Sequence, residues 1–404
     1  MTTDIGRVDS SRPKDRRALI ISRATELFWE RGYDGVTVAE VAAAVGVTAG
    51  AVYKHVPDKQ YLLSAPIRDM VMAWYASALV ATDGAADAAD AIDRLIAAVV
   101  SVAIDRPAVV ALWHRESRHL PKEARDELVA LRGRTVEVWA DSLTRLRPDL
   151  ARTTAEFRIR AALGILNSVA IIPSGVSRER VMAHFRSLLT AVLFAPLDDP
   201  RIRHGAAAPL EHDTTGPTTV AQARREELLE CGATLFRSRG YHRVGIDEIG
   251  EAAGMRGPSV YGYFDSKTDL LFELLLRMAD RLDVALDTDT MTPSTPIEVI
   301  ESLADRYVQL ALQNRDLIAV YAAELQHLPG PQLRALQKRR QMRTRTWTTL
   351  LREARPDVPA RMAQITALAT LEMVFAIARS HRYENMPRLA ETTEGLMLAA
   401  LLDS

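Results

Sequence analysis

The chain has one cysteine, almost no net charge and no long uninterrupted apolar run. Cys231 has no partner for an intrachain disulfide, so a reducing compartment such as the cytoplasm is expected. The 51 basic and 52 acidic side chains of the 404 residues give a formal net charge of −1, so any site for a polyanion must be local. The apolar stretch 162–172 is interrupted by Asn167 and Ser168 and is shorter than the about 18–20 residues of a bilayer span. The sequence therefore argues against a membrane protein.

The sequence repeats itself at an offset of 208 residues. Residues 24–63 and 232–271 share 14 identities in 40 positions without a gap. The same register places Glu116 with Glu324, and His-Leu-Pro at 119–121 with His-Leu-Pro at 327–329. A period of this length indicates a duplicated domain. The prolines and polar residues of 196–219 predict an exposed linker between the copies.

Each copy begins with the pattern of three short helices. Apolar residues at helical spacing predict a first helix that ends at a glycine, Gly32 or Gly240. In the first copy Thr37 and Glu40 have capping-box spacing, which predicts a second helix. Gly46 follows as a turn, and a third helix is predicted over residues 48–56 or, in the second copy, 257–264. This order is a helix-turn-helix arrangement.

The residues of this motif resemble the TetR family of bacterial one-component regulators. The residues that carry the resemblance in the first copy are Leu27-Phe28, Gly32-Tyr33, Thr37-Val38, Gly46-Val47, Val52-Tyr53, Lys59 and Leu62-Leu63. The resemblance implies an all-α fold of two tandem units, each with a three-helix DNA-binding domain (12–63 and 220–271) and a helical ligand-binding and dimerisation domain (64–195 and 272–404), joined by the linker 196–219. The doubled arrangement resembles tandem actinobacterial repressors of lipid-uptake and lipid-metabolism operons.

The resemblance also implies which residues contact double-stranded DNA. In the first copy these are Thr37, Thr48, Ala49, Gly50, Tyr53, Lys54, His55 and Lys59. In the second copy they are Arg256, Gly257, Pro258, Ser259, Tyr261, Tyr263 and Lys267. Tyr53 and Lys59 are expected at phosphates, whereas Lys54 and Arg256 have donors that can read bases. Because the two sets differ, we expect an asymmetric operator, with the more basic first copy binding more tightly.

The remaining helical parts of both copies exceed what DNA binding needs. In the family they hold a small effector in an apolar cavity, and their last two helices form a four-helix dimer interface, which here implies an intrachain pseudo-dimer; pairing of whole chains stays open. The candidate pocket residues are Trp113, His114, Glu116, Trp139, Phe157, Asn167, Tyr307, Tyr321, Glu324, Trp347, Glu372 and Phe375. Aromatic residues in such positions also serve as core. We expect an apolar effector such as a lipid, sterol or acyl thioester, and neither a cofactor nor a metal.

Two other classes of function compete with this hypothesis. An enzyme is disfavoured because the sequence has no HExxH, GxSxG, phosphate-loop or dinucleotide motif. A helical adaptor that does not bind DNA would not explain why both copies contain the same glycine turn, tyrosine and lysine. The prediction is a sequence-specific transcriptional regulator, most readily a repressor released by its effector, with a ligand-responsive activator as the alternative.

Overall fold

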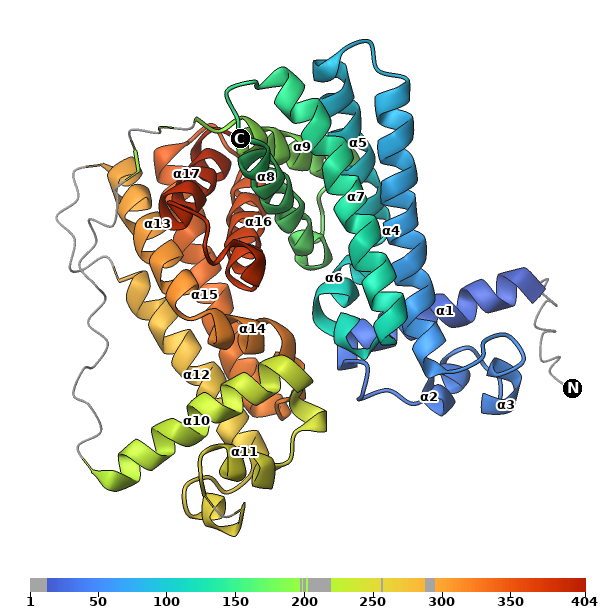
Figure 1. Cartoon of the computed structure of the whole chain (residues 1–404), viewed down its shortest axis with the longest axis vertical. Coiled ribbons are helices and arrows are strands. Elements are labelled where there is room, and N and C mark those ends of the chain that lie inside the picture. The colour runs from blue at the N-terminus through green and yellow to red at the C-terminus, as the bar shows by residue number, and fades with distance from the viewer. Residues whose placement is uncertain (1–12, 197, 199–200, 203–218, 256, 288–294) are drawn as a thin grey trace, which may run out of the picture.

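The computed structural model describes residues 13–196, 198, 201–202, 219–255, 257–287 and 295–404, and its secondary structure in these ranges is helical throughout (Figure 1). The N-terminal unit contains α1 (Pro13–Arg31), α2 (Val38–Ala44), α3 (Ala49–Val52), α4 (Lys59–Asp83), α5 (Ala88–Asp105), α6 (Pro107–Glu116), η1 (Ser117–His119), α7 (Lys122–Leu146), α8 (Arg152–Ile165), η2 (Leu166–Ile171) and α9 (Arg178–Phe194). The C-terminal unit contains α10 (Val220–Arg239), η3 (Tyr241–Arg243), α11 (Ile246–Ala252), η4 (Gly257–Gly262), α12 (Lys267–Ala285), α13 (Pro296–Gln313), α14 (Arg315–Glu324), η5 (Leu325–His327), α15 (Gly330–Ala354), α16 (Ala360–Ala378), η6 (His381–Tyr383) and α17 (Leu389–Leu402). The expectation of an all-α fold built from two tandem units is confirmed.

The turns of the helix-turn-helix motifs form as their residues predict. The Thr37 hydroxyl accepts from the Glu40 amide at 3.2 Å, and the Thr37 amide donates to the Glu40 carboxylate at 2.7 Å, which completes the capping box. Gly46 and Gly254 adopt φ values of +70° and +66° in the two turns. A left-handed backbone of this kind is strained for any residue with a Cβ, so glycine is required at both places.

The third helix of each motif is shorter than predicted. In the first unit, α3 has four residues, and the following turn is closed by the amides of Lys54 and His55 on carbonyls three residues earlier. In the second unit, the segment forms the 3-10 helix η4. Glycines at both of its ends and a proline inside it weaken an α-helix, which explains the difference.

The last helices of the two units pack against each other, α8 along α16 and α9 along α17. Gly164 on α8 permits the close approach, since a Cβ at this residue would lie 3.0 Å from the Cβ of Ala376. The ring of His184 on α9 is hydrogen-bonded to the hydroxyl of Thr366 at 2.8 Å. Figure 1 shows these helices at the end of the molecule that holds the C-terminus. The two halves of one chain thus share a helical interface.

The linker differs from the expectation of a wholly exposed segment. Ile202 is 7% exposed and lies against Gly395 of α17, where the missing side chain leaves room for it. Arg201 pairs with Asp403 at 2.7 Å. Burial of the Ile202 side chain in the space left by Gly395 removes apolar surface from water, which stabilises this part of the linker against α17.

Among the described helices, α16 alone is long and apolar enough to cross a bilayer by itself. The helix α5 joined to residues 107–119 passes the same test only as a span bent by 87°. A buried core helix of a soluble protein has the same length and composition, and α16 packs against α8, α15 and α17.

Candidate DNA-binding heads and effector cavity

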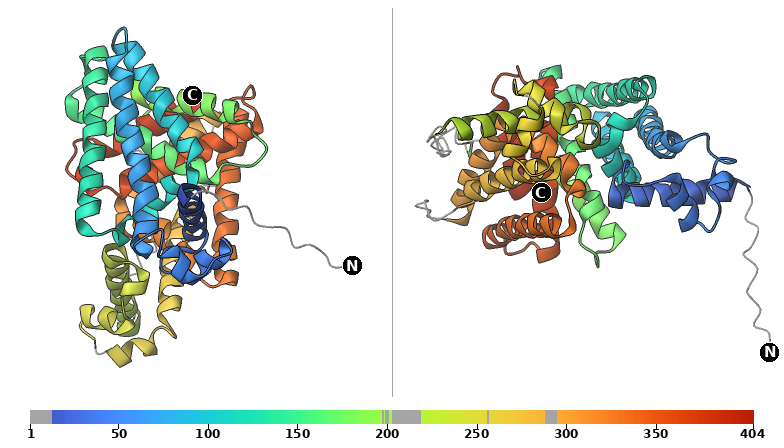
Figure 2. Two further views of the ribbon diagram at one scale, coloured as in Figure 1. Left: turned by 90° about the vertical axis from the view of Figure 1, so that its right-hand side faces the viewer. Right: turned by 90° about the horizontal axis from the view of Figure 1, so that it is seen from below.

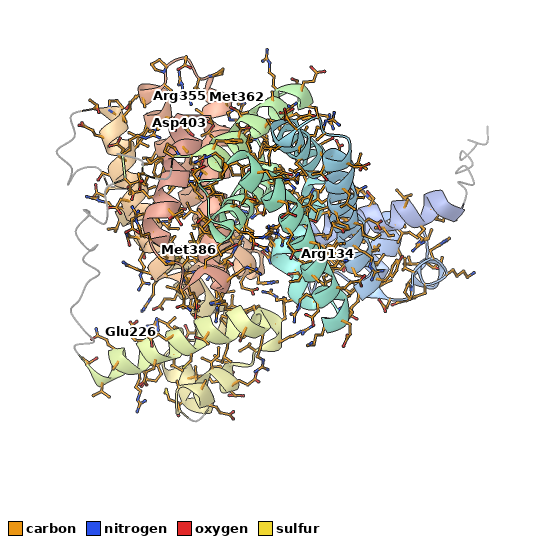
Figure 3. All side chains as sticks on the ribbon, turned by 45° about the horizontal axis from the view of Figure 1, so that its top comes forward. Arg134, Glu226, Arg355, Met362, Met386 and Asp403 are labelled. Carbon is orange, nitrogen blue, oxygen red and sulfur yellow. The ribbon has the colours of Figure 1, made fainter. Side chains whose placement is uncertain are left out.

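We call α1–α3 the first head and α10–η4 the second head. Figure 1 shows both heads at the end of the molecule away from α9 and α17, and the side view in Figure 2 places both in its lower part. In Figure 3, Glu226 of α10 lies at one end of the molecule, and Arg355 and Asp403 lie at the other. The elements that the sequence assigns to DNA contact therefore lie at one common end.

Each head exposes a tyrosine on its third helix. Tyr53 and Tyr261 are 52% and 56% exposed, which is unusual for aromatic side chains in a molecule with a large core. Their neighbours Thr48, Lys54 and Ser259 are also exposed. A phenol, two hydroxyls and an ammonium at a protein surface supply donors suited to phosphates and base edges.

The lysines that open α4 and α12 are turned inward. The Lys59 ammonium lies 4.1 Å from the centre of the Tyr33 ring, and the Lys267 ammonium lies 4.2 Å from that of Tyr241. Lys267 also donates to the Tyr241 and Val244 carbonyls, each at 3.0 Å. Burial lowers the pKa of both lysines. Both brace the turn after the first helix, and each stays half-buried.

The other predicted DNA-contact residues are placed unevenly. The Thr37 hydroxyl is engaged by Glu40, so a phosphate at this helix start would meet backbone amides. His55 and Ala49 are half-buried, Gly50 is exposed, and Tyr263 packs partly against the core. Gly257 and Pro258 open η4, whereas Arg256 lies outside the described residues.

A cluster of charged and aromatic side chains joins the units just above the heads. We call residues 116–119 and 324–327 the junction. Arg118 of the N-terminal unit holds both carboxylate oxygens of Glu324, at 2.5 and 3.0 Å, and Glu324 is fully buried. His327 lies 3.2 Å from the same carboxylate and is hydrogen-bonded to His242 at 3.0 Å. These bonds outweigh burial and lower the pKa of Glu324.

The equivalent carboxylate of the N-terminal unit lacks such a partner. Glu116 is 1% exposed, and its Oε1 has no hydrogen bond within the described residues. The position equivalent to Arg118 is Gln326, which cannot neutralise it. The Nε2 of His119 lies 3.5 Å from the other carboxylate oxygen of Glu116, Oε2. Burial therefore raises the pKa of Glu116. Across the described ranges, no three His, Cys, Asp or Glu side chains gather as a metal site requires.

The junction touches the heads of both units. A Cβ at Gly32, in the first head, would lie 3.3 Å from the His327 ring of the C-terminal unit. A Cβ at Gly240, in the second head, would lie 2.8 Å from the Arg118 guanidinium of the N-terminal unit. Each head also packs a tyrosine against the histidine of its own unit, Tyr33 on His119 at 4.9 Å and Tyr241 on His327 at 5.5 Å between ring centres. The junction therefore contacts both heads, each of them from the opposite unit.

The predicted pocket residues gather between the units and not in one pocket per unit. A cavity of about 330 Å³ is bounded by His114 and Asn167 from one unit and by Tyr307, Tyr321, Glu372 and Phe375 from the other. A second cavity of about 350 Å³ is bounded by Trp113, His114 and Phe157. Both volumes fall in the about 300–1,000 Å³ range of small-molecule sites.

Four predicted pocket residues lie elsewhere. Trp139 and Trp347 are 1% and 0% exposed and belong to the cores of their units, whereas Glu116 and Glu324 belong to the junction. The sequence prediction missed three arginines of the second cavity, Arg132, Arg160 and Arg379. Arg132 and Arg160 lie on the consecutive helices α7 and α8, but Arg379 lies about 220 residues further along the chain, so no local pattern brings the three together.

Comparison with known proteins gives matches over both units. The family model "Bacterial regulatory proteins, tetR family" matches residues 20–65 and 228–274, and "Tetracyclin repressor-like, C-terminal domain" matches residues 85–191 and 293–379. The HTH-type transcriptional repressor KstR2 of Mycolicibacterium smegmatis is 27% identical over 144 residues, which are 35% of this chain and 70% of that protein. The HTH-type transcriptional activator FasR of the same organism is 36% identical over 80 residues, 20% of this chain and 36% of that protein. A solved TetR-family regulator from Bordetella parapertussis aligns over 45% of this chain and 94% of its own, with 21% identity and a TM-score of 0.42.

Proposed function

Because this chain belongs to the tetR family of bacterial regulatory proteins and carries two of its units in tandem, we propose that it is a repressor released from its operator by a small effector. It is a DNA-binding transcriptional regulator and not an enzyme. The observation that carries the proposal is the placement of two helix-turn-helix heads at one end of one chain, each with an exposed tyrosine on its third helix. Such a regulator works in the cytoplasm.

The operator of this repressor is asymmetric. The first head offers Thr48 and Lys54 where the second offers Arg256 and Gly262, and α3 differs from η4 in helix type. Different donors on differently wound segments contact different bases, so two unlike half-sites are bound. A symmetric homodimer, by contrast, reads a palindrome.

The chain acts as an intrachain pseudo-dimer. In support, α8 and α9 pack against α16 and α17, as the equivalent helices of two subunits pack in a four-helix interface. The His184–Thr366 hydrogen bond and the Arg118–Glu324 ion pair also join the two units.

Effector binding changes the spacing of the heads. The cavity walls include Ala111 and Arg115 of α6, and Tyr321 and Ala322 of α14. Both helices end in the junction, which touches both heads. A ligand that binds better when α6 and α14 are displaced therefore favours a head spacing that does not fit the two half-sites.

The DNA-binding part of the proposal is tested with purified variants and operator fragments. Tyr53→Ala and Lys54→Ala each remove a surface donor, and each should weaken binding by about tenfold, the value of one lost contact of about 1–1.5 kcal/mol. Lys54→Ala should also lower the slope of log K against log salt by about 1. Val80→Ala is the control, since Val80 is 72% exposed on α4 outside the heads.

If neither Tyr53→Ala nor Lys54→Ala changes the affinity for the operator, the first head is not the DNA-binding site. Arg256→Ala should relax the preference at one or two base positions of the other half-site only. A footprint of the wild type should show two unlike half-sites, and a symmetric footprint contradicts the asymmetric operator. Because the relative FasR is named an activator, expression from a promoter fusion is measured with and without the regulator, which shows whether it represses or activates transcription.

A further inference from the structure

Three arginines with no ion pair surround one cavity between the units. Arg132 on α7 and Arg160 on α8 come from the N-terminal unit, and Arg379 at the end of α16 comes from the C-terminal unit. Within the described residues none of the three side chains has a hydrogen bond or salt bridge, and Arg132 only covers the Trp113 ring at 5.1 Å. No carboxylate lines this cavity.

Two arginines buried elsewhere in the protein show the partners that these three lack. Arg343 donates to Asp283 and to the Tyr321 hydroxyl, both at 2.7 Å. Arg158 donates to the carbonyls of Leu193 and Ala195. All three arginines are half-buried, and partial burial weakens the hydration of a guanidinium group. A group of unpaired guanidinium groups around one cavity therefore favours the binding of an anion there.

The polar groups beside the arginines are also without partners. The Arg160 Nε and the Tyr383 hydroxyl are buried and unbonded within the described residues, although the Tyr383 ring packs on Phe157 at 4.9 Å. Burial lowers the pKa of Arg132 to about 10, and burial with Arg132 and Arg379 nearby holds the pKa of His114 well below its ordinary value. The site is thus rich in donors and poor in acceptors.

The neighbouring cavity supplies an apolar wall. It shares His114 and Arg379 with the arginine-lined cavity, and Ala170, Ile171, Leu325, Leu371 and Phe375 form its apolar side. Charged side chains that include Arg115, Arg340 and Glu372 line the rest of it. Asn167, only 8% exposed, also lines it together with His114. An apolar group with one polar attachment fits these walls.

We propose that the two cavities form one binding site for an amphipathic anion, with its carboxylate or phosphate held by Arg132, Arg160 and Arg379 and its apolar part in the neighbouring cavity. The site is built by both units, so the chain binds one such molecule and not one per unit. Calling this molecule the effector rests on the function proposed above, whereas its binding does not. A carboxylate or phosphate accepts hydrogen bonds from the guanidinium groups. Such charge-assisted bonds, which can be bidentate, are among the strongest that arginine makes.

The test uses decanoate and decanol, which share an apolar chain and differ in charge. Calorimetry with the full chain, without DNA, should give one decanoate per chain and an affinity for decanol lower by about tenfold or more, since charge-assisted hydrogen bonds are lost. Arg160→Met and Arg379→Met should each reduce decanoate affinity by about tenfold and leave decanol unchanged. Arg134→Met is the matched control, because Arg134 (Figure 3) is an exposed arginine on α7 that does not line either cavity.

Folding of the variants is followed by thermal melting without ligand. Removal of an unpaired, half-buried charge should leave the melting temperature unchanged or raise it. Equal binding of decanoate and decanol, two decanoate molecules per chain, or undiminished decanoate binding by Arg160→Met and Arg379→Met would each overturn the proposal. Operator binding is measured separately: if decanoate binds as described but does not change DNA affinity, the site stands and its role as effector site is rejected.

Discussion

Replacing glutamate by glutamine at positions 116 and 324 should change stability in opposite directions. The two positions are equivalent in the repeat, and both side chains are at most 1% exposed. At 324 the charge is held by Arg118 and His327, whereas at 116 the position equivalent to Arg118 is a glutamine. The same neutral substitution thus removes a satisfied charge in one unit and an unsatisfied charge in the other.

The magnitudes follow from these contacts. Glu324→Gln weakens two charge-assisted hydrogen bonds and should cost about 2 kcal/mol, within the about 1.5–3 kcal/mol of bonds to charged groups. For a unit of this size, this lowers the melting temperature by about 4–8 °C. Glu116→Gln removes a buried carboxylate whose Oε1 has no partner in the described residues and should stabilise by about 1 kcal/mol, or about 2–4 °C.

The dependence on pH differs between the two positions. The pKa of Glu324 is lowered, so its stabilisation is present above the unfolded value of 4.5 and is lost as the pH falls through the folded pKa. The pKa of Glu116 is raised, so its destabilisation is absent below 4.5 and grows as the pH rises through the folded pKa. Both effects are therefore largest at about pH 8, and the Glu116→Gln effect is the first to shrink on acidification.

The assay is thermal melting followed by circular dichroism, with both single variants at about pH 8, pH 5.5 and pH 4. Arg118→Gln serves as the control. It should lower the melting temperature of the wild type by more than that of the Glu324→Gln variant, because the ion pair is already absent in that variant. If both glutamine variants move the melting temperature in the same direction at pH 8, the assignment of one satisfied and one unsatisfied carboxylate is wrong.

Two glycine pairs test the head turn and the contact between units. Gly46→Ala should destabilise by about 1–2 kcal/mol in a melting experiment, because its φ of +70° is strained for a residue with a Cβ although no atom lies near the added group. Gly50→Ala should be neutral or stabilising, and equal effects at both positions contradict the reasoning. Gly164→Leu should destabilise by about 1–3 kcal/mol because its Cβ meets Ala376 across the interface, whereas Gly133→Ala, in open space on α7, should not; a tolerated leucine means that α8 and α16 are not in close contact.

The heads could be predicted from the sequence because their signals are local. Thr37 and Glu40 are three residues apart, and the backbone of Gly46 depends on the turn it makes. Such interactions need no knowledge of distant segments. The third helix predicted for each head is longer than α3 or η4, because helical periodicity over a few residues does not distinguish an α-helix from a 3-10 turn.

The cavity could be predicted only in part. Aromatic residues on amphipathic helices identify buried positions, but they do not separate core from cavity, so Trp139 and Trp347 fit the pattern of pocket residues although they belong to the core. Arg132, Arg160 and Arg379 resemble the many surface arginines of this chain until α7, α8 and α16 are placed side by side. Pairing between units is set by contacts across 200 residues, and a single sequence does not show them.

The two units differ most where they must cooperate. An exact duplication would place the same residue at 118 and 326. With arginine at both positions the junction would contain two guanidinium groups, and with glutamine at both it would contain no arginine–glutamate ion pair. With Arg118 opposite Glu324, one ion pair forms across the interface, and Arg118 also covers Gly240 of the second head. One cross-unit pair therefore ties the position of the second head to the body of the N-terminal unit. A molecule that moved α6 relative to α14 would strain this pair, so we propose that the junction carries the effect of cavity binding to the DNA-binding end.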